Sequence, residues 1–103
     1  MVRRRRPVHT VGRKPDGNHA QVRDGLKAIP GMVVQDTTQT GGPLDLLCSY
    51  KGRLRFIEIK DGSLPPSARE LTDKEYEFIS RFPEHCAIAL CLDDALRAMG
   101  VTR

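Results

Sequence analysis

The sequence predicts an α/β fold with the element order helix, three strands, helix, strand, helix, on the strength of three observations. Two apolar-rich runs, 44–50 and 54–59, flank Lys51-Gly52 and are typical of a hairpin. Apolar residues recur at helical spacing within 18–30 and 72–83, and both segments end at a proline. A further apolar run at 86–92 favours a buried strand.

Length and composition indicate a globular protein. The chain has 103 residues, enough for one domain with a modest core, and its 39% hydrophobic and 29% charged residues argue against disorder. It has no run of about 18 apolar residues and no apolar leader segment at the N-terminus, so we expect a cytoplasmic protein that does not enter a membrane. Cys48, Cys86 and Cys91 match no common zinc spacing and are expected to be small buried residues.

Basic residues are concentrated at the N-terminus. Six of the 17 lysines and arginines lie within residues 1–14, which hold no acid, so 11 basic residues face 13 acidic ones in the rest of the chain. We expect residues 1–17 to form a flexible basic arm and 18–103 a single domain. Such an arm commonly contacts nucleic-acid phosphates, although it could also be a solubilising tail. The expected DNA-binding residues of the arm are Arg3, Arg4, Arg5, Arg6, Arg13 and Lys14.

The segment before the hairpin predicts a helix, a short strand and a loop. Asn18 and Gln21 have the spacing of a capping box at the start of the helix. Gly25, inside this helix, indicates a close contact between helix and sheet. The β-branched content of 32–37 predicts the strand, and 38–43 the loop that leads into the hairpin.

The turn at Lys51-Gly52 sets the register of the hairpin. Counting back from the turn places Asp45 directly opposite Glu58, with their Cβ atoms about 5 Å apart on one face. Like charges in that position repel each other, so a bound cation would relieve the repulsion. The expected pairs are Tyr50 with Arg53, Ser49 with Leu54, Cys48 with Arg55, Leu47 with Phe56, Leu46 with Ile57, and Asp45 with Glu58.

Strand periodicity adds a lysine to the two acids. Lys60 follows Glu58 by two residues and shares its face, whereas Ile59 points into the core. Two carboxylates and a lysine suit the metal-assisted hydrolysis of a phosphodiester. The carboxylates would hold a hard divalent ion that activates water, and the lysine would orient that water or stabilise developing negative charge.

The second half of the chain predicts a loop, two helices and a strand. The loop at 61–69 contains two prolines, and Thr72 and Glu75 have the spacing of a second capping box. The strand at 86–92 is followed by a helix that Asp93 or Asp94 would cap.

Together these motifs resemble the PD-(D/E)XK nuclease superfamily, and specifically the small stand-alone VRR-NUC domains of phages and bacteria. The resemblance covers 18–103 and depends on an ordered set of motifs rather than on one of them. These motifs are the Asn18-led helix, Gly41-Gly42 before Asp45, Glu58-Ile59-Lys60, Asp61-Gly62 with Pro65-Pro66-Ser67, and Leu71-Thr72 before the next helix.

The resemblance implies a restriction-endonuclease-like αβββαβ core, with a mixed central sheet flanked by helices and a further C-terminal helix. It implies that Asp45, Glu58 and the carbonyl of Ile59 bind Mg²⁺, for which Mn²⁺ would substitute, and that Lys60 is catalytic. It also implies a homodimer that cleaves branched DNA such as a Holliday junction in a bacterial or phage-infected cell. Proline usually precedes the aspartate in the family, whereas Leu44 does so here.

Several residues have two readings. Gln21 occupies a position where relatives often carry Glu, and Glu75 one where they carry Gln or Glu, so both are candidate catalytic residues; each could equally be only a helix cap. Arg69 could bind a DNA phosphate or simply be a surface residue of its loop. Asp36 could be a further site acid, and His19 could face the site.

Two hypotheses for function follow. The first is a Mg²⁺- or Mn²⁺-dependent endodeoxyribonuclease in which Asp45, Glu58 and Lys60 form the catalytic core. The alternative is a non-catalytic DNA-binding or accessory module that retains the nuclease fold and uses the basic arm.

Overall fold

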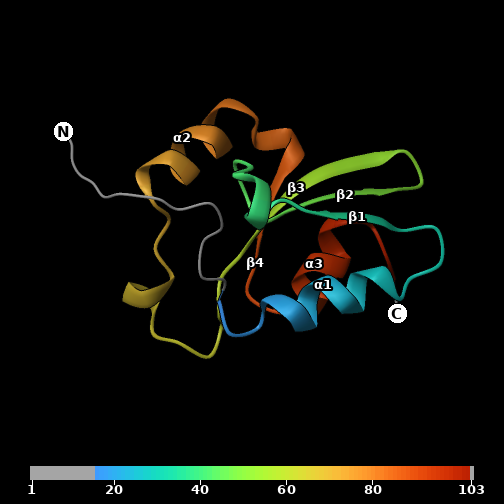
Figure 1. Cartoon of the computed structure of the whole chain (residues 1–103), viewed down its shortest axis with the longest axis horizontal. Helices are drawn as coiled ribbons and strands as arrows, with labels where there is room; N and C mark the ends of the chain where they lie inside the picture. Colours follow the sequence, from blue (N-terminus) through green and yellow to red (C-terminus); the bar gives the residue numbers. More distant parts are fainter. Residues whose placement is uncertain (1–15, 103) are drawn as a thin grey trace.

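The computed structural model describes residues 16–102 and shows a four-stranded sheet with three α-helices (Figure 1). The predicted order of helices and strands is confirmed, with short 3-10 turns between them. The helices and strands are α1 (His19–Lys27), β1 (Val33–Asp36), β2 (Leu46–Tyr50), β3 (Arg53–Ile59), α2 (Asp73–Arg81), β4 (Cys86–Ala89) and α3 (Leu92–Ala98). The 3-10 turns are η1 (Thr38–Thr40), η2 (Pro66–Arg69) and η3 (Pro83–His85).

The sheet is mixed, with the strand order β1-β2-β3-β4. Strands β1, β2 and β3 are antiparallel, and β4 runs parallel to β3. The hairpin register is confirmed from Tyr50 opposite Arg53 to Leu46 opposite Ile57. Lys51 and Gly52 both have positive φ, 49° and 82°, as a two-residue turn that matches the twist of its strands requires.

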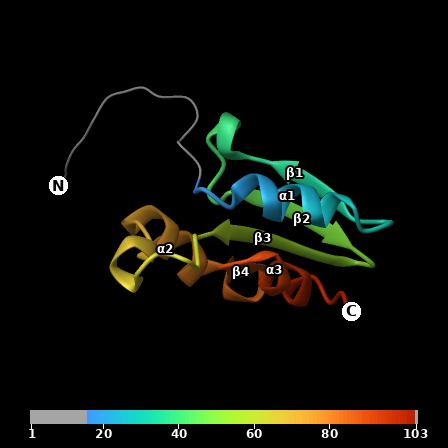
Figure 2. The ribbon, with the colours of Figure 1, turned by 90° about the horizontal axis from the view of Figure 1, so that it is seen from below.

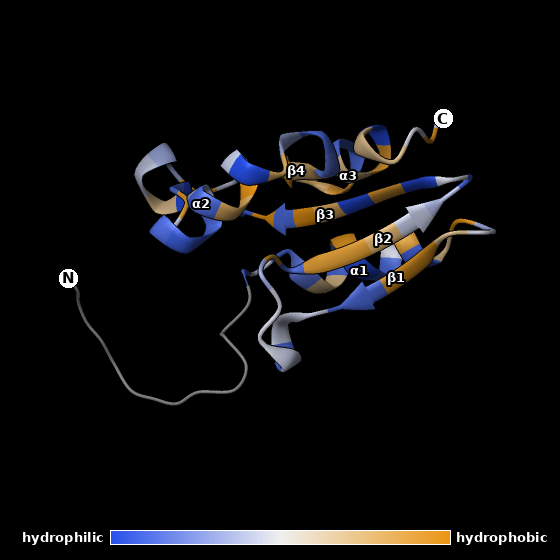
Figure 3. Cartoon of the chain, turned by 90° about the horizontal axis from the view of Figure 1, so that it is seen from above, coloured by the Kyte–Doolittle hydropathy of each residue, from blue (hydrophilic) through white to orange (hydrophobic). Residues whose placement is uncertain are grey.

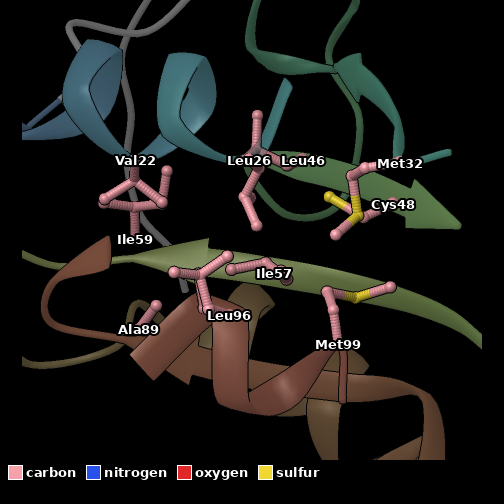
Figure 4. Close-up of a cluster of buried hydrophobic side chains, with 11 residues drawn as sticks. Val22, Leu26, Met32, Leu46, Cys48, Ile57, Ile59, Ala89, Leu96 and Met99 are labelled. Atoms are coloured by element: carbon pink, nitrogen blue, oxygen red, sulfur yellow. The ribbon is translucent and has the colours of Figure 1, made fainter. Parts of the chain in front are cut away.

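Helices α1 and α3 cover one face of the sheet, and α2 lies against one end of the other face (Figures 1 and 2). The hydrophobic core fills the space under α1 and α3, where Val22 of α1 and Leu96 of α3 converge on Ile57 and Ile59 of β3 (Figure 4). On the opposite face α2 is anchored by Phe78, whose ring meets Phe56 edge-on at 5.1 Å. The prediction that Ile57 and Ile59 point into the core is therefore confirmed.

The outer face of the sheet is only partly covered (Figure 3). Beyond α2, apolar side chains of this face reach solvent, and Val33 is 65% and Leu54 50% exposed. Strand β4 lies at the edge of the sheet and is shorter than predicted, because it ends at Ala89. Its predicted burial is wrong: only Ala89 is buried, since an edge strand with a half-covered outer face leaves Ile88 45% exposed.

Two predicted helix caps are wrong and one is confirmed. Asn18 does not cap α1 with its side chain, and Cys91, rather than Asp93 or Asp94, precedes the first residue of α3. Asp94 lies within the first turn and accepts a hydrogen bond from the Leu90 N–H at 2.9 Å. The capping box of Thr72 and Glu75 is present in full at the start of α2.

Gly25 contacts a helix rather than the sheet. A Cβ built on Gly25 would lie 2.5 Å from Cδ2 of Leu92, which is the first residue of α3. The glycine therefore allows α1 and α3 to approach each other closely above the core.

Candidate active site

Asp45 lies immediately before β2 and is held by its backbone and by its side chain. The pairing of β2 with β3 ends at Leu46 opposite Ile57, so the predicted pair of Asp45 with Glu58 is not part of it. The Asp45 N–H donates instead to the Ile57 carbonyl at 3.1 Å. Its carboxylate oxygen Oδ2 accepts the N–H of Ile59 at 2.8 Å. The side chain therefore lies across the end of β3, and Asp45 is only 7% exposed.

Glu58 and Lys60 extend from the end of β3 on the same side. The Lys60 ammonium Nζ lies 3.3 Å from Oε2 of Glu58 and 3.1 Å from Oε1 of Glu75, so one lysine bridges two carboxylates. All three side chains are largely buried, because the exposed fraction is 12% for the Lys60 side chain and 3% and 6% for the two glutamates. The structure thus brings together four residues proposed from the sequence: Asp45, Glu58, Lys60 and Glu75.

Glu75 serves the helix and the cluster at once. Its Oε1 accepts the N–H of Thr72 at 2.9 Å and, at the same atom, the ammonium of Lys60. The hydroxyl of Thr72 in turn accepts the N–H of Glu75 at 3.1 Å, which completes the capping box. Glu75 is therefore a helix cap and a member of the cluster at the same time.

The electrostatics follow from burying three carboxylates with one ammonium. Burial, the charge of Asp45 and a hydrogen bond to Glu75 raise the pKa of Glu58 to about 9, although Lys60 opposes this. Burial would lower the pKa of Lys60, but the hydrogen bond with Glu75 and the charge of Glu58 raise it above its usual value. Burial would likewise raise the pKa of Glu75, but the Thr72 N–H, Glu58 and Lys60 lower it.

The donor set fits a hard divalent cation. Oε1 of Glu58 is buried and has no hydrogen-bond partner among residues 16–102, and such an orphaned oxygen is costly unless a ligand satisfies it. Asp45, Glu58 and the Ile59 carbonyl would supply only oxygen, which Mg²⁺ and Mn²⁺ prefer. Within the described residues no three His, Cys, Asp or Glu side chains form a metal cage, so main-chain oxygen and water would have to complete the coordination.

Asn18 supports the backbone next to the lysine. Its side-chain amide donates to the carbonyls of Lys60 at 3.3 Å and Leu90 at 3.1 Å, so it ties the start of α1 to the ends of β3 and β4. This role replaces the predicted cap. It was not visible in the sequence, because the acceptors lie 42 and 72 residues away.

His19 and Asp36 pair with each other on the α1 side of the sheet. Nε2 of His19 lies 2.9 Å from Oδ2 of Asp36, and Arg23 approaches the same oxygen at 3.4 Å. Burial would raise the pKa of Asp36, but hydrogen bonds from Thr38 and His19 hold it well below its usual value. Asp36 pairs with core-facing Leu46, so it shares that face, whereas Glu58 alternates to the other one.

The remaining candidates do not join the cluster. Gln21 lies on the exposed side of α1, since the buried residues of that helix are His19, Val22 and Leu26. Arg69 lies in η2, and no hydrogen bond or ion pair links it to the cluster within residues 16–102. The basic residues of the arm, Arg3, Arg4, Arg5, Arg6, Arg13 and Lys14, lie outside the described residues.

Comparison of the chain with protein-family models, curated proteins and solved structures gave no match. None of the helices in residues 16–102 combines the length and the apolar character that crossing a bilayer demands.

Proposed function

We propose that the chain is a metal-dependent endonuclease that hydrolyses phosphodiester bonds in DNA, with a restriction-endonuclease-like core of the VRR-NUC type. The observation that carries the proposal is the buried cluster in which Lys60 bridges Glu58 and Glu75 while Asp45 lies across the end of β3. The mixed four-stranded sheet with flanking helices is compatible with such a core.

A purely structural ion pair explains this cluster less well. One ammonium compensates one carboxylate, whereas Lys60 contacts two buried carboxyl groups and a third, that of Asp45, is buried at the same end of β3. Glu58 retains a proton far above its ordinary pKa. Burying surplus like charge is destabilising, so a cluster that served stability alone would be better built from apolar residues. Strongly perturbed carboxylates beside a lysine are typical of functional sites.

The residues of the chain have distinct roles in this proposal. A divalent ion held by Asp45, Glu58 and the Ile59 carbonyl would activate water and polarise the phosphoryl oxygen. Lys60 keeps its charge, because its pKa is raised, and can donate to the attacking water or to a phosphate oxygen. Glu75 orients the ammonium, and the Ile59 N–H orients the Asp45 carboxylate.

The substrate and the assembly belong to the same proposal. We propose branched DNA such as a Holliday junction as the substrate, with the arm at 1–14 contacting its phosphates. Two cuts in such a junction need two sites, so we include a homodimer in the proposal. Sedimentation equilibrium of the purified chain measures its oligomeric state directly. A monomer at working concentration would refute the homodimer.

Cleavage of labelled DNA tests the enzymatic assignment. Junction, flap and linear DNA are incubated with Mg²⁺ and the wild type, Lys60→Ala or Lys74→Ala, the last being an exposed lysine of α2. We expect Lys60→Ala to slow cleavage by about 100-fold or more, as removal of one charge-stabilising donor does in other enzymes, and Lys74→Ala to cleave like the wild type.

Equal cleavage by the wild type and Lys60→Ala would refute the catalytic role of Lys60. A wild type that binds DNA but cleaves none of the three substrates would favour the non-catalytic DNA-binding module.

A further inference from the structure

The loop between β1 and β2 folds around Thr37, the residue that follows β1. The Thr37 carbonyl accepts the N–H of Gly42 at 2.9 Å, and its side chain is turned inward, so Thr37 is only 9% exposed. A Cβ built on Gly42 would lie 2.4 Å from Cβ of Thr37. The loop can therefore close onto Thr37 only because residue 42 has no side chain.

Thr37 also binds the backbone of Leu44 and Asp45. Its hydroxyl Oγ1 donates to the Leu44 carbonyl at 2.5 Å, and its N–H donates to the Asp45 carbonyl at 2.9 Å. Two successive carbonyls are thus fixed by one threonine. On the β3 side, the Asp45 N–H is fixed by the Ile57 carbonyl.

A proline directly before Asp45 would restrict the backbone there, because its ring fixes φ and limits the preceding residue. Here Leu44, fully buried, occupies that position, and Pro43 lies one residue earlier. The hydrogen bonds from Thr37 supply an equivalent restriction through space. The Asp45 carboxylate depends on this backbone, since its 2.8 Å contact with the Ile59 N–H requires the main chain at 45 to be in place.

We propose that Thr37 is a positioning residue for Asp45. Its hydroxyl fixes the Leu44–Asp45 backbone and so places the carboxylate against the Ile59 N–H. The catalytic consequence depends on the nuclease function proposed above, whereas the placement of the carboxylate does not.

The test compares Thr37→Val, which replaces the hydroxyl by a methyl group of similar size, with Thr37→Ser, which keeps the hydroxyl. Thr40→Val is the matched control, because Thr40 is an exposed residue of the same loop and, within residues 16–102, its hydroxyl bonds only the Thr37 carbonyl, at 3.3 Å. The first readout is the ¹H–¹⁵N NMR signal of the Ile59 amide in metal-free protein. The second is the affinity for Mn²⁺ alone, measured by electron paramagnetic resonance.

We expect the Ile59 amide proton of Thr37→Val to move upfield as its bond to the carboxylate lengthens, while Thr37→Ser and Thr40→Val retain the wild-type position. Mn²⁺ affinity of Thr37→Val should fall by about three- to tenfold, the worth of one hydrogen bond, and recover in Thr37→Ser. A general loss of stability would not shift one amide signal of the folded protein and would not be reversed by serine.

An unchanged Ile59 signal in Thr37→Val would overturn the proposal, and so would a Thr37→Ser protein that shifts as far as Thr37→Val. If Thr37→Val does not fold, Gly42→Ala displaces the Thr37 side chain from the other side and must shift the same signal. A wild type that neither binds Mn²⁺ nor cleaves DNA would refute the nuclease function, and the Ile59 signal would still decide the role of Thr37.

Discussion

Glu58 should make the metal-free protein less stable as the pH rises. The pKa of Glu58 is 4.5 in an ordinary environment and about 9 in the folded protein, so between these values only the folded state keeps the proton. A raised pKa contributes stability that is fully present below the unfolded value and is lost as the pH rises through the folded one. The free energy of unfolding should fall by about 1.4 kcal/mol per pH unit in that window.

Urea unfolding in EDTA at several pH values measures this contribution. From about pH 6 to about pH 7.5 the proton on Glu58 contributes a loss of about 2 kcal/mol in the wild type. Glu58→Gln keeps the shape of the side chain but has no proton to retain. Over the same pH range its free energy of unfolding should therefore fall by about 2 kcal/mol less than that of the wild type. Glu77→Gln removes an exposed glutamate of α2 and should keep the wild-type slope.

A Glu58→Gln protein with the same pH slope as the wild type would refute this reasoning. That result would mean that Glu58 is ionised in the folded state and that the cluster tolerates three negative charges with a single ammonium.

Two further predictions concern the packing of the helices and the arm. Gly25→Ala should lower the free energy of unfolding by about 1–3 kcal/mol, because the new methyl group meets Leu92. The double variant Gly25→Ala/Leu92→Ala should lose less stability than the sum of the two single variants. Strict additivity in urea unfolding would contradict the contact. Deletion of residues 1–14 should weaken DNA binding and reduce its dependence on salt, while the affinity for Mn²⁺ stays unchanged. If fluorescence anisotropy shows that DNA affinity depends on salt as in the full chain, the arm is not part of the interface.

The core of the candidate site could be predicted from the sequence because its geometry is local. A two-residue turn sets the register as far as Leu46 opposite Ile57, and the alternation of side chains along β3 places Glu58 and Lys60 on one side. The register does not extend to Asp45, whose N–H bonds the Ile57 carbonyl instead of pairing with Glu58. The capping box of Thr72 and Glu75 was predictable for the same reason, since it spans four residues. That Glu75 also reaches Lys60 depends on how α2 packs against the sheet, which local spacing does not specify.

The predictions that were wrong involve competition between local and distant partners. Asn18 could cap its own helix, but carbonyls of β3 and β4 take its amide instead. The strand at 86–92 has the composition of a buried strand, yet its place in the sheet is at the edge and one face stays half open. Thr37 carries no recognisable motif, because its importance comes from carbonyls seven and eight residues further along the chain.

The shared oxygen of Glu75 makes the first turn of α2 and the charge of Lys60 parts of one cooperative unit. If that turn unravels, Lys60 loses the Glu75 carboxylate at the same moment. Local fraying of α2 would therefore break this ion pair without unfolding the sheet. Substitutions at residue 75 are constrained twice, and only a side chain that can accept from both the Thr72 N–H and the ammonium meets both demands. Helix stability and the ion pair of Lys60 at this end of the molecule therefore cannot be changed independently during evolution or design.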